Sequence, residues 1–414
     1  MNTRPASRRP GLLRAAAVVG AAGLFAASVA RAQVAPTAVV GASGGGAPHS
    51  IFTDPTDGAF DAGAFMLSKQ GFLPVPIIIT EPAVGYGAGL GLMFLRYPEG
   101  KTPAEQAAAE QAAGEDKPRI ELPNITGVAG GATENGTWFV GGLHLQNFNH
   151  GATRSITGLL RAHAELTYYG AAGEGTPRDY VSDTWIFRQQ IEHRLGKSDW
   201  FIGGHYTYLG ADSVFDFGNS SIAGLVPNEF DSATAGLGGI LSYDSRDTPF
   251  TPGAGTRAQF IASRYDEALG GDFSYTRIDA FSATWWTLDP RLVLGWRIEG
   301  HFTPGDDRVP FYHQAMVSLR GVPAGRYQGR QTLVNELELR FALNPRWSLV
   351  GFGGAGQVTM ADPVEVVEAD LVPAGGVGFR YLLARQLGLH TGCDFAWSED
   401  DFAFYLTLGS AWQR

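Results

Sequence analysis

Charged and large apolar side chains alternate along run after run of about ten residues in this chain. In residues 292–302 the even positions are mostly large and apolar, whereas Arg297, Glu299 and His301 occupy odd positions. Successive side chains of a β-strand point to opposite faces, so a period of two predicts strands with one apolar and one polar face. The chain is therefore expected to be all-β.

A β-sandwich also alternates, but its strands are shorter. Here the polar face keeps several charges over ten or more residues, as in 184–194 and 333–341. A transmembrane barrel needs aromatic girdles at its two rims. Tryptophan and tyrosine lie near the ends of the runs at Trp138, Trp200, Tyr208, Trp286, Trp347 and Trp412. The pattern favours a transmembrane up-and-down antiparallel β-barrel.

Sixteen such runs follow one another, at residues 74–81, 84–95, 120–132, 136–147, 153–168, 180–195, 199–210, 232–243, 254–266, 273–287, 290–303, 331–343, 346–358, 372–384, 387–397 and 402–412. Outer-membrane barrels have short periplasmic turns and long external loops. Long connections at 169–179, 211–231, 304–330 and 359–371 alternate with short ones. The Ala/Glu-rich stretch at 96–119 predicts a surface helix on the periplasmic side.

The first 32 residues predict a secretory signal peptide. Four arginines precede an apolar stretch at 15–30, and small residues mark a cleavage site after about Ala32. Cleavage there leaves a flexible periplasmic lead-in at 33–70 and a barrel at 71–414. No later stretch approaches the roughly 20 apolar residues of a spanning helix. Export and strand pattern together predict the outer membrane of a Gram-negative bacterium.

Composition narrows the functional classes. The 56 glycines suit β structure with many turns, and the formal net charge of -10 argues against a nucleic-acid partner. The single cysteine, Cys393, allows no disulfide within the chain and is expected to face lipid. The nine histidines show no metal-ligand spacing, so neither a metal nor a cofactor is expected.

Two enzyme-like motifs lack the structural context that they need. Residues 41–45 fit G-x-S-x-G with no strand before them and no helix after them. Residues 351–356 fit G-x-G-x-x-G inside a predicted strand, so no helix N-terminus is available for a pyrophosphate. No catalytic residue is therefore predicted, and an outer-membrane enzyme such as a lipase is disfavoured.

Three segments carry a further pattern. Residues 243–253 (YDSRDTPFTPG) predict a periplasmic turn, in which Asp caps, Pro fixes φ and Gly253 supplies a positive φ. The motif residues of this turn are Asp244, Arg246, Asp247, Pro252 and Gly253. In the long loop after the eleventh strand, SLRG at 318–321 is followed by GRY at 325–327. The third segment is the tail from Gly376, ending in FYLTLGSAW.

In this order and spacing, the three segments resemble the barrel of the bacterial surface antigen family. That superfamily contains the outer-membrane assembly and two-partner-secretion translocator barrels, and the resemblance covers about 71–414. Family members usually carry POTRA domains before the barrel, whereas the 38 residues from 33 to 70 cannot hold one. The expected F-x-D-x-G motif reads FGGAG at 352–356, without its acid. The chain is thus similar to a member without POTRA domains.

The resemblance implies that the loop holding Arg320 and Gly321 folds back into the lumen, where the arginine pairs with carboxylates of the wall. Strand parity places Glu338 and Asp394 on that inner wall as candidate partners. The alternative is an exposed loop arginine near other loop charges. Parity also places more charges inside the lumen: Arg161, His163, Glu165, Arg188, Glu192, Arg194, Arg297, Glu299 and His301.

The resemblance implies a non-enzymatic role in outer-membrane protein insertion, translocation or lipid handling. The expected partners are outer-membrane lipids, unfolded outer-membrane or secreted protein clients, and a separate periplasmic protein that supplies POTRA function. The alternative from the residues alone is a passive diffusion channel with a charged lumen, because charged inner walls can filter ions.

Overall fold

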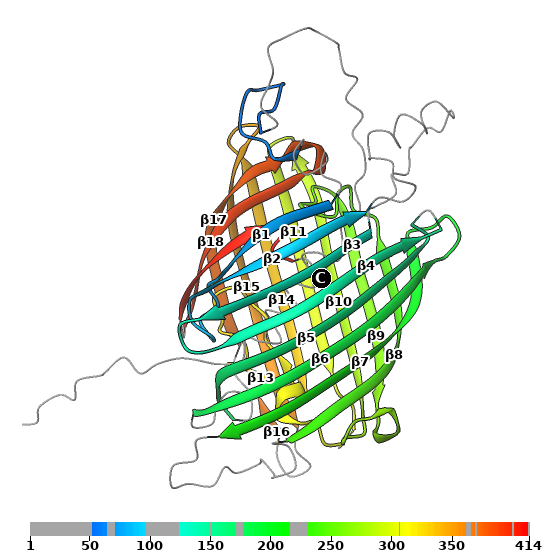
Figure 1. Ribbon diagram of the computed structural model, residues 1–414. Helices are drawn as coiled ribbons and strands as arrows, with labels where there is room; N and C mark the ends of the chain where they lie inside the picture. The colour runs from blue at the N-terminus through cyan, green and yellow to red at the C-terminus, as the bar shows by residue number, and fades with distance from the viewer. Residues whose placement is uncertain are drawn as a thin grey trace, which may run out of the picture.

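The computed structural model describes residues 52–63, 71–96, 124–149, 151–170, 177–215, 231–305, 307–361, 366–368, 371–399 and 401–412. Its strands form one curved wall that closes almost completely into a barrel (Figure 1). The all-β class and the sixteen strands predicted for the wall are confirmed. The predicted boundaries at 153–168 and 372–384 match the observed strands exactly to the residue.

The wall strands in chain order are β1 (Gly71–Ile79), β2 (Gly87–Arg96), β3 (Asn124–Thr133), β4 (Trp138–Phe148), β5 (Thr153–Tyr168), β6 (Arg178–Arg194), β7 (Trp200–Phe215), β8 (Asp231–Asp244), β9 (Gly255–Tyr265), β10 (Tyr275–Asp289), β11 (Leu292–Phe302), β14 (Gln331–Ala342), β15 (Trp347–Ala361), β17 (Val372–Ala384), β18 (Leu389–Ser398) and β19 (Phe402–Leu408). Three short strands lie outside this series: β12 (Ala315–Met316), β13 (Gln328–Gly329) and β16 (Val366–Glu368). Short 3-10 helices are η4 (Glu267–Leu269), η5 (Phe311–His313) and η6 (Arg385–Leu387).

Antiparallel ladders join each wall strand to the next, from β1–β2 through to β18–β19. Among the described residues no ladder joins β1 to β19, so the wall has one seam. Near it, the rings of Tyr86, just before β2, and Phe404 in β19 are stacked at 5.7 Å. Edge strands leave backbone groups unpaired, so this seam is the weakest line of the wall.

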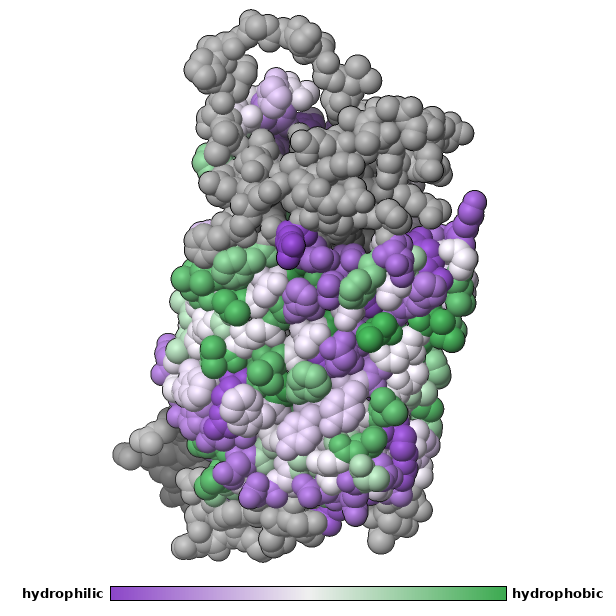
Figure 2. Space-filling model, turned by 45° about the vertical axis from the view of Figure 1, so that its right-hand side comes forward, coloured by the Kyte–Doolittle hydropathy of each residue, from purple (hydrophilic) through white to green (hydrophobic). Residues whose placement is uncertain are grey.

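The wall separates apolar and polar faces. On β14, Leu333, Leu337 and Leu339 are 43–52% exposed, whereas Glu336 and Glu338 are buried on the opposite face. Figure 2 shows hydrophobic residues over the height of the wall, interrupted by hydrophilic ones. Four of the predicted girdle residues are exposed at the ends of wall strands: Trp138, Trp200, Trp286 and Trp347.

Trp412 does not belong to the girdle, which corrects the prediction. β19 ends at Leu408 rather than at 412, and Gly409 then turns the chain with a φ of 86°. The amide of Ser410 donates to the carbonyl of Phe250 in the periplasmic turn. Trp412 is consequently buried and packs against Trp285 on the inner side.

The predicted inward orientation of Arg161, His163 and Glu165 is also wrong. Arg161 lies opposite Trp185 in the β5–β6 ladder, and its guanidinium carbon is 5.1 Å from the centre of the Trp185 ring. Trp185 is 48% exposed on the outer face. Residues opposite each other in a ladder share a face, so alternate residues of β5 from Arg161 to Glu165 point outward. The ladder register with β6 decides which face these side chains take, and the sequence of β5 alone does not give that register.

A similar correction applies at β18. By parity with Phe395 the sequence predicts that Leu387 and Leu389 face lipid, yet both are buried in a cluster with Ala384, against which Phe250 packs. Cys393 stands in the outward row with Phe395 but is only 8% exposed, because neighbouring side chains cover it.

The signal peptide at 1–32 and most of the helix expected at 96–119 lie outside the described residues. Of the expected flexible lead-in, 52–63 is described and is held against the barrel by ion pairs given below. No helix in the described part of the chain is long and apolar enough to cross a membrane.

Candidate functional site

The long loop between β11 and β14 folds into a compact internal hairpin. β12 and β13 pair within it, and the amide of Val317 donates to the carbonyl of Tyr327. Its apolar side chains are buried against the wall strands β14, β15 and β17: Val317, Leu319 and Val322 contact Val334, Val358 and Val372. The loop is therefore part of the barrel interior.

Gly321 lies at the tightest approach of this loop to the wall. Its φ is +94°, a left-handed conformation that favours glycine. A Cβ here would lie 3.0 Å from the backbone of Trp397 in β18. The Gly321 amide donates to the Tyr405 hydroxyl at 3.1 Å, and its carbonyl accepts from the Ser398 hydroxyl at 2.7 Å. Only glycine fits this position.

Arg320 reaches three carboxylates of the inner wall. Its Nε lies 2.8 Å from Glu336 Oε1, and its Nη1 lies 2.8 Å from both Glu338 Oε2 and Asp394 Oδ2. The guanidinium also stacks 3.6 Å from the centre of the Phe352 ring. Burial by itself lowers the pKa of Arg320, yet the three carboxylates raise it above its ordinary value, so the arginine stays charged. We call this group the loop anchor.

Asp394 carries a second arginine. Nη1 of Arg380 in β17 lies 2.5 Å from Asp394 Oδ1, and Nη2 lies 2.9 Å from Oδ2. Both Asp394 and Arg380 are almost completely buried. Two arginines and three acids thus neutralise most of each other's charge, as buried ions require.

A chain of alternating charges extends from the anchor along β11 and β10. Arg297 Nε lies 3.3 Å from Glu336 Oε2, and its Nη2 donates to the carbonyl of Ser318 in the loop. Glu299 accepts from the Ser318 hydroxyl at 3.2 Å and contacts His301 at 2.6 Å. His301 in turn contacts Asp279, which pairs with Arg277. The loop is therefore held by two neighbouring parts of the wall.

The C-terminus reaches the same anchor. The indole Nε1 of Trp412 donates to Glu336 Oε2 at 2.6 Å. Sequence reasoning missed this contact because Trp412 was counted among the rim aromatics. It also passed over Glu336 as a partner of Arg320, although Glu336 shares the inward parity of Glu338.

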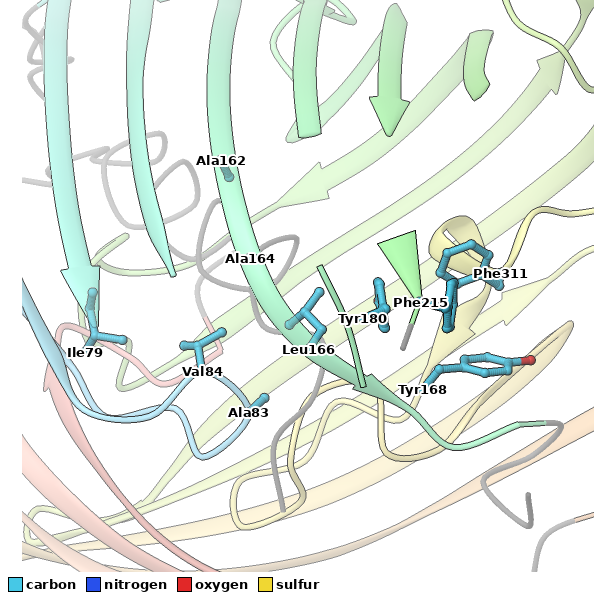
Figure 3. Close-up of a cluster of buried hydrophobic side chains, with 10 residues drawn as sticks. All are labelled: Ile79, Ala83, Val84, Ala162, Ala164, Leu166, Tyr168, Tyr180, Phe215 and Phe311. Atoms are coloured by element: carbon cyan, nitrogen blue, oxygen red, sulfur yellow. The ribbon is translucent and has the colours of Figure 1, made fainter. Parts of the chain in front are cut away.

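The outer end of the loop contacts an aromatic cluster. Phe311 packs with Tyr168, Tyr180 and Phe215, which come from the ends of β5, β6 and β7 (Figure 3). Ring centres of Phe311 and these three residues lie 5.2–5.7 Å apart. The cluster therefore attaches the loop at the end of the barrel where the long connections lie.

The loop also spans the seam. Gly321 contacts Tyr405 of β19, and the amide of Ala324 donates to Glu81 Oε1 at 3.2 Å, in the turn between β1 and β2. Burial raises the pKa of Glu81 to about 7, against the opposing effect of backbone hydrogen bonds. One short stretch of the loop therefore contacts both edges of the wall.

The predicted periplasmic turn lies between β8 and β9. Arg246 donates from Nε and Nη2 to the two carboxylate oxygens of Asp244, at 2.8 and 2.9 Å. Asp247 Oδ1 accepts from the amide of Gly253 at 3.0 Å, and the carbonyl of Pro252 accepts from Arg340 Nη2 at 2.7 Å. These hydrogen bonds fix the conformation of the turn, as the structural interpretation of the motif expects.

The glycine with positive φ in this turn is Gly255, not Gly253 as expected. Gly255 has a φ of +97°, and a Cβ there would lie 2.3 Å from the carbonyl oxygen of Ser245. Gly253 instead closes the turn through its amide. The reversal thus occurs two residues later than the motif indicated.

A second ion cluster attaches residues 52–63 to the periplasmic turns. Arg346, between β14 and β15, contacts Asp54, Asp57 and Asp61 at 2.6–2.7 Å. Arg385 in η6 contacts Asp54 at 2.5 Å and also Asp57. Hydrogen bonding to Arg346 holds the pKa of Asp57 well below its ordinary range. No sequence motif had linked this segment to turns almost 300 residues away.

Among the residues that the structure describes, no group of three or more His, Cys, Asp or Glu is arranged to hold a metal ion. The loop anchor is an electrostatic device: its arginines are paired, and no nucleophile lies beside a base within it. What this arrangement can do is hold or release the loop.

Comparison with known proteins fits this geometry. Residues 188–363 match the Omp85 superfamily domain. No curated protein sequence matches the chain. This match supports the expected family resemblance over residues 188–363, and the solved structures described next share the barrel fold.

Three solved structures share the fold. BamA from Haemophilus ducreyi lacking POTRA domains 1–3 superposes with a TM-score of 0.51 at 12% identity, over 82% of this chain and 70% of that one. CdiB from Acinetobacter baumannii gives 0.54 at 11%, over 82% and 60%. CdiB from Escherichia coli gives 0.53 at 13%, over 82% and 62%. The chain thus spans 60–70% of the length of these proteins.

Proposed function

Because the chain carries an Omp85 superfamily domain within a sixteen-stranded barrel, we propose that it inserts or translocates polypeptides at the outer membrane. The clients are unfolded outer-membrane or secreted proteins. The lipids of the outer membrane surround the barrel wall. A separate periplasmic protein delivers the clients. The work is done by conformational change of the loop and wall, without a covalent step.

The loop anchor is the observation that carries the proposal. A passive pore needs an open lumen, whereas here a folded loop is fixed inside the barrel by Arg320 and three acids. Removing one partner of a buried ion pair is strongly destabilising, because it leaves the other charge buried and uncompensated. Such a group suits a loop that has a defined closed position.

Conductance in planar bilayers tests the closed position. The full-length protein should give low or flickering conductance, and Arg320→Ala should raise it. The matched control is Arg291→Ala, since Arg291 is exposed in the short turn between β10 and β11, away from the loop. Large, steady conductance of the unchanged protein would instead identify a diffusion channel with a charged lumen.

A folding assay tests whether unfolded outer-membrane proteins are clients of this protein. The protein is placed in phosphatidylcholine/phosphatidylglycerol vesicles, and a urea-unfolded outer-membrane barrel is added. Folding is followed by heat-modifiable migration on gels. We expect faster folding with the protein than with empty vesicles, and a loss of this gain in Arg320→Ala but not in Arg291→Ala. Equal rates with and without the protein would contradict an insertion role.

Export follows the sequence prediction, and we propose processing after about Ala32. N-terminal sequencing of protein purified from outer membranes should begin at or near Gln33. A chain that retains Met1 would contradict cleavage.

A further inference from the structure

The outer face of β3–β6 carries polar side chains at the middle of the wall. We call them the outward polar patch: Thr126, His144, Gln146, Ser155, Thr157 and Gln189. Each of these side chains lies on the same face of the sheet as an exposed apolar residue of its own strand or of the paired strand. Val128, Val140, Leu159 and Ile191 mark that outer face with exposures of 44–53%.

The inner face of β3, β4 and β5 is mainly apolar, whereas β6 keeps Gln190 and Glu192 buried inside. Ile125, Leu143 and Leu145 are buried there in one cluster, with Met93 and Ile156 packed against it. On β14 the arrangement is the reverse, with leucines outside and glutamates inside. Polarity in the β3–β5 sector is therefore inverted relative to the wall that holds the loop anchor.

The patch lies at the depth of hydrocarbon. β4 runs from Trp138 to Phe148, two exposed aromatic residues, and a tilted strand of roughly 9–11 residues crosses a membrane. His144 is near the centre of that span. Gln189 and Thr157 share its ladder row on β6 and β5. Lipid tails offer these side chains no hydrogen bonds, so exposure to lipid is unfavourable.

Part of the patch is satisfied internally. Thr126 Oγ1 lies 2.8 Å from His144 Nδ1, and the Thr157 hydroxyl donates to Gln189 Oε1 at 2.6 Å. Gln189 Nε2 donates to Ser155 Oγ at 2.9 Å. Within the described residues, the side-chain amide of Gln146 has no hydrogen-bond partner. The patch thus still offers donors and acceptors to a second surface.

We propose that this patch is the interface of a homodimer in the membrane. Hydroxyl, amide and imidazole groups each donate and accept, and none of the six residues is an acid, a lysine or an arginine. The same surface on a second copy is therefore complementary to it, as a twofold interface requires. Gly130, Gly142 and Gly204 lie on the same outward rows and let two walls approach closely.

The neighbouring charges agree with this arrangement. Above the patch, Arg161 and Asp183 pair at 2.9 Å on the outer face, with side chains 29% and 37% exposed. The pair itself is neutral, so it adds no repulsion between two copies. Glu165, further along the outward row of β5, adds a negative charge outside the patch.

Crosslinking in intact outer membranes tests the interface. In a Cys393→Ser background, Gln146→Cys is oxidised with copper phenanthroline and run on non-reducing gels. The control is Leu337→Cys, which is exposed on the opposite outward face of β14. We expect a dimer-sized band for Gln146→Cys alone. Equal bands for both variants, or a band of another mass, would overturn the proposal, the latter in favour of a different protein partner.

Dilution in lipid tests the energetics. His144→Leu combined with Gln189→Leu removes two of the six hydrogen-bonding side chains of the patch, and single-molecule photobleaching in phosphatidylcholine/phosphatidylglycerol vesicles counts copies. Interhelical hydrogen bonds in membranes contribute about 0.6–2 kcal/mol each, so dimerisation should weaken roughly tenfold. Leu337→Ala with Leu339→Ala is the control, and heat-modifiable migration checks folding. Unchanged association in the leucine double variant, or monomers at every lipid ratio in the unchanged protein, would contradict the dimer.

Discussion

At the scale of single residues, Arg320 decides the position of the loop. Its guanidinium presents several donors in a fixed plane, which suits three carboxylates at once better than a lysine ammonium does. Glu336, Glu338 and Asp394 come from two different strands, so the arginine joins β14 to β18 through the loop. The wall strands are joined by ladders that do not involve Arg320.

Arg320→Ala should therefore release the loop while the barrel stays folded. Leaving buried acids uncompensated costs on the order of 3–5 kcal/mol when burial is deep, and less when water enters. We expect faster proteolysis within 303–330 with heat-modifiable migration retained. Asp394→Ala or Glu338→Ala should behave similarly, and each double variant with Arg320→Ala should be less than additive. Wild-type proteolysis in Arg320→Ala would contradict the anchor.

Glu81 should make the loop contact sensitive to pH. Its pKa is raised to about 7 where the turn meets Ala324, against an ordinary value of 4.5. Between these values the docked turn binds more protons than the released one, so docking weakens as pH rises through this window and levels off above 7. Proteolysis of 303–330 should accelerate from pH 5 to pH 7.5.

The control for this prediction is Glu81→Gln, whose amide oxygen still accepts from Ala324 but does not titrate. Its proteolysis should be nearly constant over the same range, after correction for the protease's own pH dependence. An identical pH response in both proteins would remove Glu81 as the cause.

At the scale of elements, residues 52–63 behave as a docked segment on two periplasmic turns. Arg346 alone contacts three aspartates, and the Tyr381 hydroxyl donates to the carbonyl of Phe60 at 2.6 Å. Short turns between membrane strands are stiff, so they form a firm base for such a segment. The rim of the barrel thereby gains a polar layer at the end where the short turns lie.

Arg346→Ala should release this segment. Hydrogen bonding to Arg346 lowers the pKa of Asp57, so this contact is fully formed above about pH 4 and is lost as the pH falls through the lowered pKa. We expect limited proteolysis to cut within 52–63 in Arg346→Ala at pH 7, and in the unchanged protein only at pH values well below 4. Arg291→Ala, in another periplasmic turn, is the control. Protection of 52–63 in Arg346→Ala would show that other contacts suffice.

At the scale of the whole molecule, the direction of every strand follows from one orientation of the barrel. Short turns should face the periplasm and long loops the outside. Engineered cysteines in 211–231 and 359–371 should react with a membrane-impermeant maleimide in intact cells, while those in 196–199 and 287–290 should not. Cys393 gives little background because it is 8% exposed. Labelling of the short turns from outside would invert the topology.

The sequence by itself determined the wall. Period-two alternation depends only on which side chains avoid water, so it predicted sixteen strands and the inward parity of Glu338 and Asp394. It also determined that 304–330 is long and carries Arg320. These are local properties of the chain, readable within a run of about ten residues.

Only the tertiary structure decided which distant residues contact each other. Register with β6 put Arg161 outside, and the turn at Gly409 sent Trp412 to Glu336. The approach of 52–63 to Arg346 joins residues almost 300 positions apart. The polar outer face of β3–β6 became visible only when ladders aligned four strands. Such contacts depend on long-range closure of the sheet, because a strand's own pattern fixes its two faces but not which one meets the lumen.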